Sequence, residues 1–202
     1  MTSIILKLIK EIDCLWEPVY PYLTMQIQDI YKGQGGNILE IGPFCGVIFH
    51  LQRQAIGSSF LIATFPQGMG GFFREEATRL KLEDKVNIME TDSYLAGIKE
   101  NTIDLAIFRG ALFFPSLFHV EFSAIYRALK VNGVALIGGG FGRFTPPEVI
   151  QDIGERSRDL NLRIGKVEIG TDTIWQSIKA SNVKEGNFEV ISKGGLWVKM
   201  EK

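Results

Sequence analysis

An acidic residue and two glycines stand at the end of a short apolar run, in the segment NILEIGPFCG at residues 37–46. A glycine directly after a strand lets the backbone turn sharply and lets a ligand come close, as Gly42 and Gly46 could. A helix that begins near Gly46 would present free N–H groups to a phosphate or to the carboxylate of an amino acid. Glu40 would repel a pyrophosphate but attract an α-amino group. The pattern therefore favours an amino-acid-bearing ligand over a dinucleotide.

Arg109 is a second residue with chemical potential, because it ends the apolar segment IDLAIFR on the side where a ligand is expected. A buried arginine needs an anionic partner, and both a ligand carboxylate and a structural salt bridge are open for it. His119 is expected early in a helix near the rim of the site. A capping or surface position is favoured there over a general base. We therefore name no catalytic residue.

The cysteines and histidines indicate neither a metal site nor a nucleophile. The chain has two cysteines, Cys14 and Cys45, and two histidines, His50 and His119, and no zinc spacing can be built from them. We predict that both cysteines are small buried packing residues, since no base lies near Cys45 in the sequence. We expect no bound metal. Such sparse cysteines fit a reducing compartment, so the expected location is cytoplasmic.

The composition is that of an ordinary globular chain. It has 202 residues, 46% of them hydrophobic and 22% charged, which suits one domain with a small cap. The formal net charge of -1 argues against the clustered Lys and Arg that a nucleic-acid footprint needs. No stretch approaches the ~18 continuous apolar residues of a membrane span. We expect neither nucleic acid nor a membrane as a partner.

Apolar strands alternate with amphipathic helices from residue 38 onward. The pattern predicts strands at 38–41, 59–65, 85–90, 103–108 and 134–137, and helices at 46–55, 72–80 and 118–129. Thr145 is expected to cap a helix that runs to about residue 160, and a further helix is expected at 172–180. Two β-rich runs at 188–192 and 196–200 flank a glycine turn and indicate a hairpin. The predicted fold is α/β, a doubly wound, Rossmann-like, mostly parallel sheet with a reversed terminal strand.

A helical cap is predicted ahead of this sheet, with the cap at residues 1–34 and the α/β domain at residues 35–202. Helical spacing of apolar residues indicates an amphipathic helix over residues 5–16, and its interrupting charges argue against a signal peptide. Pro18 and Pro21 break the chain, and a second helix is expected at 22–31. The first helix could cover a pocket or pair with a second subunit in a homodimer.

The order of the motifs resembles that of class I S-adenosylmethionine-dependent methyltransferases. NILEIGPFCG resembles their first motif, an apolar strand followed by an acid and G-x-G-x-G, with Glu40, Gly42 and Gly46 at matching positions. Three further segments resemble the third strand, the fourth strand, and the helix and fifth strand: VNIMETDSYL (86–95), TIDLAIFRGALFF (102–114) and IYRALKVNGVALIGGG (125–140). The resemblance covers roughly residues 35–202. It implies S-adenosylmethionine as the cofactor and methyl transfer as the reaction.

The resemblance also assigns cofactor contacts to the carboxyl ends of the strands. Asp92 stands where relatives usually meet the adenine amino group, although a Thr-Asp-Ser run is also an ordinary helix cap. The expected cofactor-binding residues are Glu40, Gly42, Pro43, Phe44, Gly46, Thr64, Phe65, Asp92, Ser93 and Arg109.

Two positions depart from the family's pattern. Phe44 replaces the middle glycine, and its ring could pack on the sulfonium cation or narrow the pocket. The second strand ends Ala63-Thr64-Phe65 without an acid for the ribose, which Thr64, Gln67 or the backbone could hold instead. Either change could weaken or abolish cofactor binding.

A small-molecule methyl acceptor is expected beside the cofactor. The segment FRGALFF lacks the Asn/Asp-Pro-Pro-aromatic signature of amino-methylating enzymes that act on nucleic acids and glutamine. The aromatic, arginine-containing rim hints at a hydrophobic or aromatic acceptor with a negative group. The expected substrate-binding residues are Tyr20, Tyr22, Phe113, Phe114, His119, Phe141 and Arg143.

Two other functions stay open at this point. The first is a non-catalytic or regulatory binding protein on the same fold, which Phe44 and the missing ribose acid motivate. The second is an NAD-type oxidoreductase, which the alternating strands and helices permit. The loop is not G-x-G-x-x-G and no acid ends the second strand, so the sequence disfavours the oxidoreductase.

Overall fold

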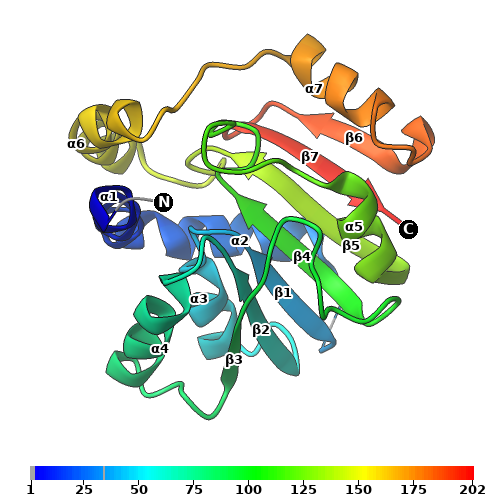
Figure 1. Cartoon of the computed structure of the whole chain (residues 1–202), viewed down its shortest axis with the longest axis horizontal. Coiled ribbons are helices and arrows are strands. Elements are labelled where there is room, and N and C mark those ends of the chain that lie inside the picture. Colours follow the sequence, from blue (N-terminus) through cyan, green and yellow to red (C-terminus); the bar gives the residue numbers. More distant parts are fainter. Residues whose placement is uncertain (1–2, 34) are drawn as a thin grey trace.

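A mixed sheet of seven strands forms the centre of the protein, in the order β3-β2-β1-β4-β5-β7-β6 (Figure 1). The computed structural model describes residues 3–33 and 35–202. The strands are β1 (Asn37–Ile41), β2 (Ser59–Thr64), β3 (Val86–Glu90), β4 (Ile103–Arg109), β5 (Leu129–Gly139), β6 (Phe188–Ile191) and β7 (Leu196–Glu201). Strands β1 to β5 pair in parallel, whereas β7 runs antiparallel to both β5 and β6. The predicted α/β fold with a reversed terminal strand is confirmed.

The central strands are apolar on both faces because helices pack on both sides of them. The residues of β1 from Ile38 to Ile41 and those of β4 from Leu105 to Arg109 are buried. The helices are α1 (Ser3–Leu15), α2 (Tyr20–Ile30), α3 (Val47–Arg53), α4 (Met69–Arg79), α5 (Phe122–Ala128), α6 (Pro147–Arg163) and α7 (Thr171–Lys179). None of those helices is long and apolar enough to cross a membrane.

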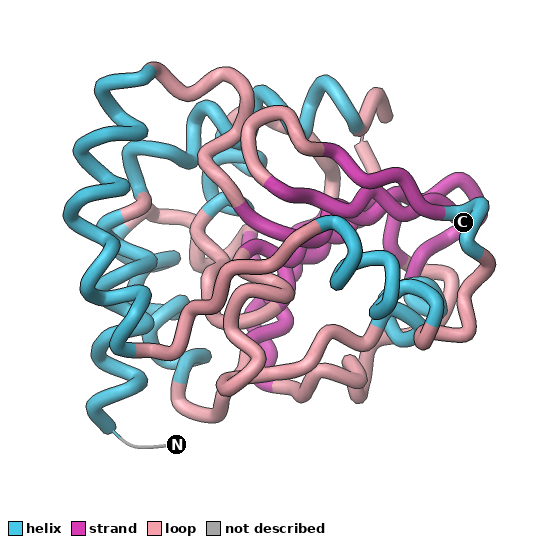
Figure 2. Tube along the Cα trace, turned by 90° about the horizontal axis from the view of Figure 1, so that it is seen from above, coloured by secondary structure: helices cyan, strands magenta, loops and turns pink. Residues whose placement is uncertain are grey.

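Helices α1 and α6 lie side by side near the carboxyl ends of the central strands, although they are far apart in sequence (Figures 1 and 2). Helix α1 packs through Leu8, Ile9 and Ile12, which are buried. A short 3-10 turn at Glu17–Val19 joins α1 to α2, and α2 packs against α3. The N-terminal segment therefore lies over the strand ends where parallel α/β sheets bind ligands.

Three sequence-based expectations about these elements are wrong. The helix expected at 118–129 begins only at Phe122, and residues 110–121 form the loop after β4. Thr145 does not cap α6: the cap position is Pro146, and the Thr145 hydroxyl donates to the Phe141 carbonyl instead. Pro21 does not precede the second helix, which was expected at 22–31, but stands in the first turn of α2, where a proline is tolerated because its missing N–H would have no partner.

Asp104 ties the amino-terminal edge of the sheet together. Its Oδ2 accepts a hydrogen bond from the Asn37 N–H at 2.7 Å and forms an ion pair with Lys130 Nζ at 2.7 Å. Three neighbouring strands, β1, β4 and β5, thus share one carboxylate. These contacts hold the three strands together at the edge of the sheet opposite the site.

We expect Asp104→Ala to lower the free energy of unfolding by about 1–3 kcal/mol, because the Asn37 N–H and the Lys130 ammonium lose their acceptor. Urea denaturation would measure this loss. Glu83→Ala, at an exposed loop position, is the control and should change stability by no more than about 0.5 kcal/mol. Equal effects of the two variants would contradict a structural role for Asp104.

Candidate functional site

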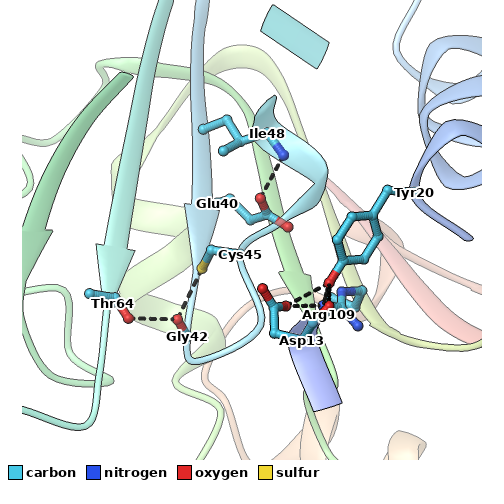
Figure 3. Close-up of polar contacts among 8 residues, drawn as sticks. All are labelled: Asp13, Tyr20, Glu40, Gly42, Cys45, Ile48, Thr64 and Arg109. Atoms are coloured by element: carbon cyan, nitrogen blue, oxygen red, sulfur yellow. Dashed lines mark hydrogen bonds and ion pairs between the residues drawn. The ribbon is translucent and has the colours of Figure 1, made fainter. Parts of the chain in front are cut away.

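Glu40 is fully buried at the end of β1 and uses only half of its carboxylate (Figure 3). Oε2 accepts a hydrogen bond from the Ile48 N–H, in the first turn of α3, at 2.7 Å. Oε1 is buried and has no hydrogen-bond partner among the described residues. Burial raises the pKa of this carboxyl to about 8, although Arg109 and the backbone N–H of Ile48 act in the opposite direction. The side chain is therefore protonated at neutral pH until a cation approaches.

The two glycines of the loop make room for side chains of this chain. A Cβ on Gly46 would stand only 2.1 Å from the Tyr20 ring, and one on Gly42 would stand 2.6 Å from the Phe108 ring. Gly42 also has a left-handed backbone, with φ of 95°. The space that the missing side chains of these glycines leave is thus occupied by the rings of Tyr20 from α2 and Phe108 from β4.

The carbonyl of Gly42 is the hydrogen-bond acceptor for both neighbouring polar side chains. The Thr64 hydroxyl donates to it at 3.1 Å and the Cys45 thiol at 2.9 Å (Figure 3). Burial raises the pKa of the Cys45 thiol well above its usual value, which agrees with the predicted packing role. Cys14 corrects the same prediction, because it is exposed on α1.

Arg109 ends β4 as a buried cation and pairs with the N-terminal helices. Its Nη2 donates to Asp13 Oδ1 and to the Tyr20 hydroxyl, both at 2.5 Å, and the Tyr20 hydroxyl donates to Asp13 Oδ1 at 2.6 Å (Figure 3). Burial raises the pKa of Asp13 to about 6, so its carboxylate is charged at neutral pH and can pair with Arg109. Of the two partners left open for Arg109, the structure contains the salt bridge.

Aromatic rings surround the Arg109 guanidinium. Its Cζ lies 4.7 Å from the centre of the Tyr20 ring, 5.4 Å from that of Phe44 and 5.5 Å from that of Trp16. These distances are those of cation–π contacts. The cation that the Phe44 ring meets in this structure is therefore Arg109. The Nε of Arg109 is buried and has no hydrogen-bond partner among the described residues.

The residues expected at a nucleoside are engaged with other parts of the chain. Phe65 packs edge-on against Phe108 and Phe118, with ring centres 5.8 and 5.6 Å apart, and is buried. Asp92 is exposed, and its Oδ1 accepts hydrogen bonds from the backbone of Tyr94 and Ala96, as in an ordinary turn. Ser93 is half-buried beside it.

A cavity of about 460 Å³ opens beyond Arg109, between the ends of β4 and β5, helix α1 and helix α6. It includes five of the residues singled out in the sequence: Phe44, Arg109, Phe113, Phe114 and Phe141. The Trp16 ring stacks on Phe141 with ring centres 4.6 Å apart and also lines this space. The volume is typical of a small-molecule pocket.

The other expected substrate residues lie outside this lining. Tyr20 is held in the Arg109 network, and Tyr22 is half-buried on α2. His119 is exposed in the loop after β4. Arg143 forms an ion pair with Asp29 and stands over the Phe144 ring.

Helix α6 supplies lining residues that sequence reasoning missed. Arg156 and Arg163 on this helix pair with acids four residues earlier, whereas Arg158 lines the cavity. Ser157 and Asn161 line it too and are buried. Polar residues four apart on the buried face of an amphipathic helix were the available signal, since they mark a stripe that faces something polar.

We expect Tyr20→Phe to lower the free energy of unfolding by about 1–3 kcal/mol, because Arg109 and Asp13 both lose a hydrogen bond while the ring stays. Asp13→Ala should cost more, about 3–5 kcal/mol, since it leaves a buried cation without its anion. Thermal or urea unfolding would measure both, with Tyr22→Phe as the matched control. A Tyr22→Phe effect as large as that of Tyr20→Phe would contradict this network.

Glu40 should make the folded state less stable as pH rises. Its pKa is raised from 4.5 to about 8, so the folded state keeps a proton that the unfolded chain loses. Its stabilising contribution is complete below the unfolded pKa and is lost as pH rises through the folded pKa, by up to about 1.4 kcal/mol per pH unit. Glu40→Gln cannot ionise. The stability of the wild type relative to this variant should therefore fall between about pH 5 and 8, as urea midpoints would show, and a constant difference would refute the raised pKa.

Comparisons with known proteins bear on this arrangement. No protein-family model matches the sequence, and no curated protein matches it significantly. A solved structure from Methanococcus maripaludis, provisionally named an S-adenosyl-L-methionine-dependent methyltransferase, is 24% identical. That alignment covers 98% of this chain and 91% of the other, with a TM-score of 0.79.

Two more distant structures share the same architecture. A SAM-dependent methyltransferase from Aquifex aeolicus is 13% identical, with 90% of this chain and 89% of the other covered and a TM-score of 0.59. The [4+2]-cyclase SpnF is 17% identical, with 84% and 57% covered and a TM-score of 0.57. At these identities the likeness shows the fold. This chain has the fold of the class I S-adenosylmethionine-dependent methyltransferases.

Proposed function

We propose that this protein is an S-adenosylmethionine-dependent methyltransferase that acts on a small molecule. The observation that carries the proposal is the unpartnered Oε1 of Glu40, a buried acceptor beside the glycine loop. A buried polar atom without a partner is costly unless a ligand satisfies it. An α-ammonium group would supply both a donor and a positive charge at this oxygen.

The residues around the loop fit the amino-acid end of such a cofactor. The cofactor, when bound, supplies a methyl group that its sulfonium has already activated. The chain's own task is then to hold donor and acceptor in line and to exclude water. Glu40 would fix the ammonium group. The aromatic rings of Phe44 and Phe114, whose centres are 5.3 Å apart, would keep water from the space next to it.

The N-terminal segment, residues 1–34, would act as a cap in this proposal. Tyr20 and Asp13 bring it against the glycine loop and Arg109. Because Tyr20 fills the room beside Gly46, a nucleoside would require the cap to shift. A function in a homodimer, a cytoplasmic location and the absence of nucleic-acid partners stay predictions.

A small-molecule acceptor is supported by the adjoining cavity. Its volume of about 460 Å³ suits a molecule of drug-like size. The cavity also lies between α1 and α6, which enclose the space beyond the strand ends.

A second candidate function is a binding protein, or an enzyme of other chemistry, on the same fold. Two observations favour it: Phe65, Phe108 and Phe118 pack together at the expected nucleoside side, and the Thr64 hydroxyl is engaged with Gly42. One solved structure of this fold is named a [4+2]-cyclase, so the fold does not fix methyl transfer as the reaction. This candidate predicts ligand binding in the cavity without methyl transfer.

Calorimetric titration separates these two candidates. We expect S-adenosylmethionine and S-adenosylhomocysteine to bind with a Kd of roughly micromolar order, in the range common for enzyme ligands. Glu40→Gln should weaken binding about tenfold or more, because a carboxylate–ammonium hydrogen bond becomes a neutral one. Glu83→Gln, in an exposed loop, is the matched control and should leave the Kd unchanged.

The same titration tests the protonation of Glu40. Near pH 7 the carboxyl must lose its proton as an ammonium group arrives, so binding of S-adenosylhomocysteine should release up to about one proton. The apparent enthalpy would then vary with the ionisation enthalpy of the buffer in the wild type but much less in Glu40→Gln. Failure of well-folded wild type to bind either nucleoside would remove the methyltransferase proposal and leave the second candidate.

A further inference from the structure

The cavity beside Arg109 has walls made of rings. Five aromatic side chains line it: Trp16, Phe44, Phe113, Phe114 and Phe141. Helix α6 and the loop after it contribute polar and aliphatic side chains to the lining, and the floor, where β4 and β5 end and β7 begins, is glycine. Such walls select a flat, largely apolar molecule, because stacked and edge-on ring contacts stabilise it beyond simple burial.

Two buried hydrogen-bond donors in this lining have no acceptor. Trp16 Nε1 and Arg109 Nε are both buried and both lack a partner among the described residues. The Arg109 side chain is only 5% exposed, so water hardly reaches its guanidinium. Its Cζ lies 5.5 Å from the centre of the Trp16 ring, so the two residues that carry these donors are neighbours in the lining. Unpartnered buried donors call for an acceptor.

The charged residues that line the cavity are mostly basic. Arg158 and Lys166 line it together with one acid, Glu168. Asp13 already balances Arg109, so the rim carries an excess of positive charge. Burial lowers the pKa of Lys166, which a nearby anion would counteract. Lys166 Nζ also stands 5.9 Å from the centre of the Phe113 ring, at the edge of the apolar wall.

We infer that the cavity binds an aromatic acid, with its ring between the aromatic walls and its anionic oxygen accepting hydrogen bonds from Trp16 Nε1 and Arg109 Nε. The inference rests on the proposed function only in making this acid the methyl acceptor. The cavity and its donors stand apart from Glu40, whose free atom is an acceptor and suits the opposite charge. The two ligand sites thus differ in the sign of the group that they bind.

Calorimetric titration with 2-naphthoate, its neutral amide 2-naphthamide and the cation 2-naphthylmethylammonium tests this inference without any cofactor. We expect 2-naphthoate to bind at least about tenfold more tightly than the amide, the usual scale of a charged hydrogen bond in a buried site. The cation should bind most weakly. An amide or a cation that binds as tightly as the acid, or a protein that binds none of the three, would overturn the inference.

Two pairs of variants locate the anion. Trp16→Phe keeps the ring that stacks on Phe141 but removes the N–H, so it should weaken 2-naphthoate binding several-fold and leave 2-naphthamide unchanged. Trp175→Phe on α7, outside the cavity lining, should change neither. Arg158→Ala should weaken only the acid, whereas Arg156→Ala, on the same helix but paired with Asp152, should not.

The outcome also separates this inference from the proposed function. If 2-naphthoate binds as expected while S-adenosylhomocysteine does not bind, the aromatic-acid site stands and methyl transfer is refuted. If the nucleoside binds but the amide equals the acid, methyl transfer stands and the aromatic-acid site is refuted. Equal effects of Trp16→Phe on acid and amide would mean that the indole acts only as a packing surface.

Discussion

A buried cation, Arg109, is the constraint on which the arrangement of the site depends. A guanidinium withdrawn from water costs several kcal/mol unless it is paired, and the acid of its own strand, Asp104, stands at the opposite end of β4 and pairs with Lys130. Its anion comes from α1, as Asp13, and its hydroxyl partner comes from α2, as Tyr20. The ion pair therefore joins the first helices of the chain to the end of β4. The segment around Asp13, which lies 96 positions before Arg109 in the sequence, thus becomes part of the wall of the site.

This attachment decides how the glycine loop is used. Once Tyr20 is fixed by Arg109 and Asp13, its ring meets the loop at Gly46, the position where a side chain would collide with it. Phe108 does the same at Gly42 from the sheet side. The loop is packed on two sides by its own chain. The unpartnered atom that remains is Glu40 Oε1, which gives this end of the site a single, acidic feature.

The fold was predictable from the sequence, whereas much of the site was not. Apolar runs with period two and helical spacing report burial on one or both faces, and that information is local, so the order of strands and the reversed hairpin could be foreseen. Glu40 could be foreseen for the same reason, since an acid in a buried strand stands out. The partner of Arg109 could not be, because nothing local links Asp13 to residue 109.

The missed lining of α6 has a related cause. Ser157 and Asn161 look like ordinary polar residues of an amphipathic helix, and only the position of α6 beside α1 turns them toward a cavity. Thr145 illustrates the opposite error. Its sequence context is that of a helix cap, yet its hydroxyl donates a hydrogen bond to the Phe141 carbonyl instead. Local propensity gives way wherever a tertiary partner satisfies the same group.

The two ends of the site differ in the charge of the ligand group that they suit. At the glycine loop, Glu40 is an acid with a raised pKa, and its unpartnered oxygen suits a cation. In the cavity, the unpartnered donors and the basic residues suit an anion. Between them stands Arg109, whose charge is balanced by Asp13 and screened by rings. Asp13 pairs with Nη2 of this guanidinium, whereas its Nε has no partner among the described residues. Arg109 therefore has two roles at once, because the cation that holds α1 at the end of β4 also lines the cavity.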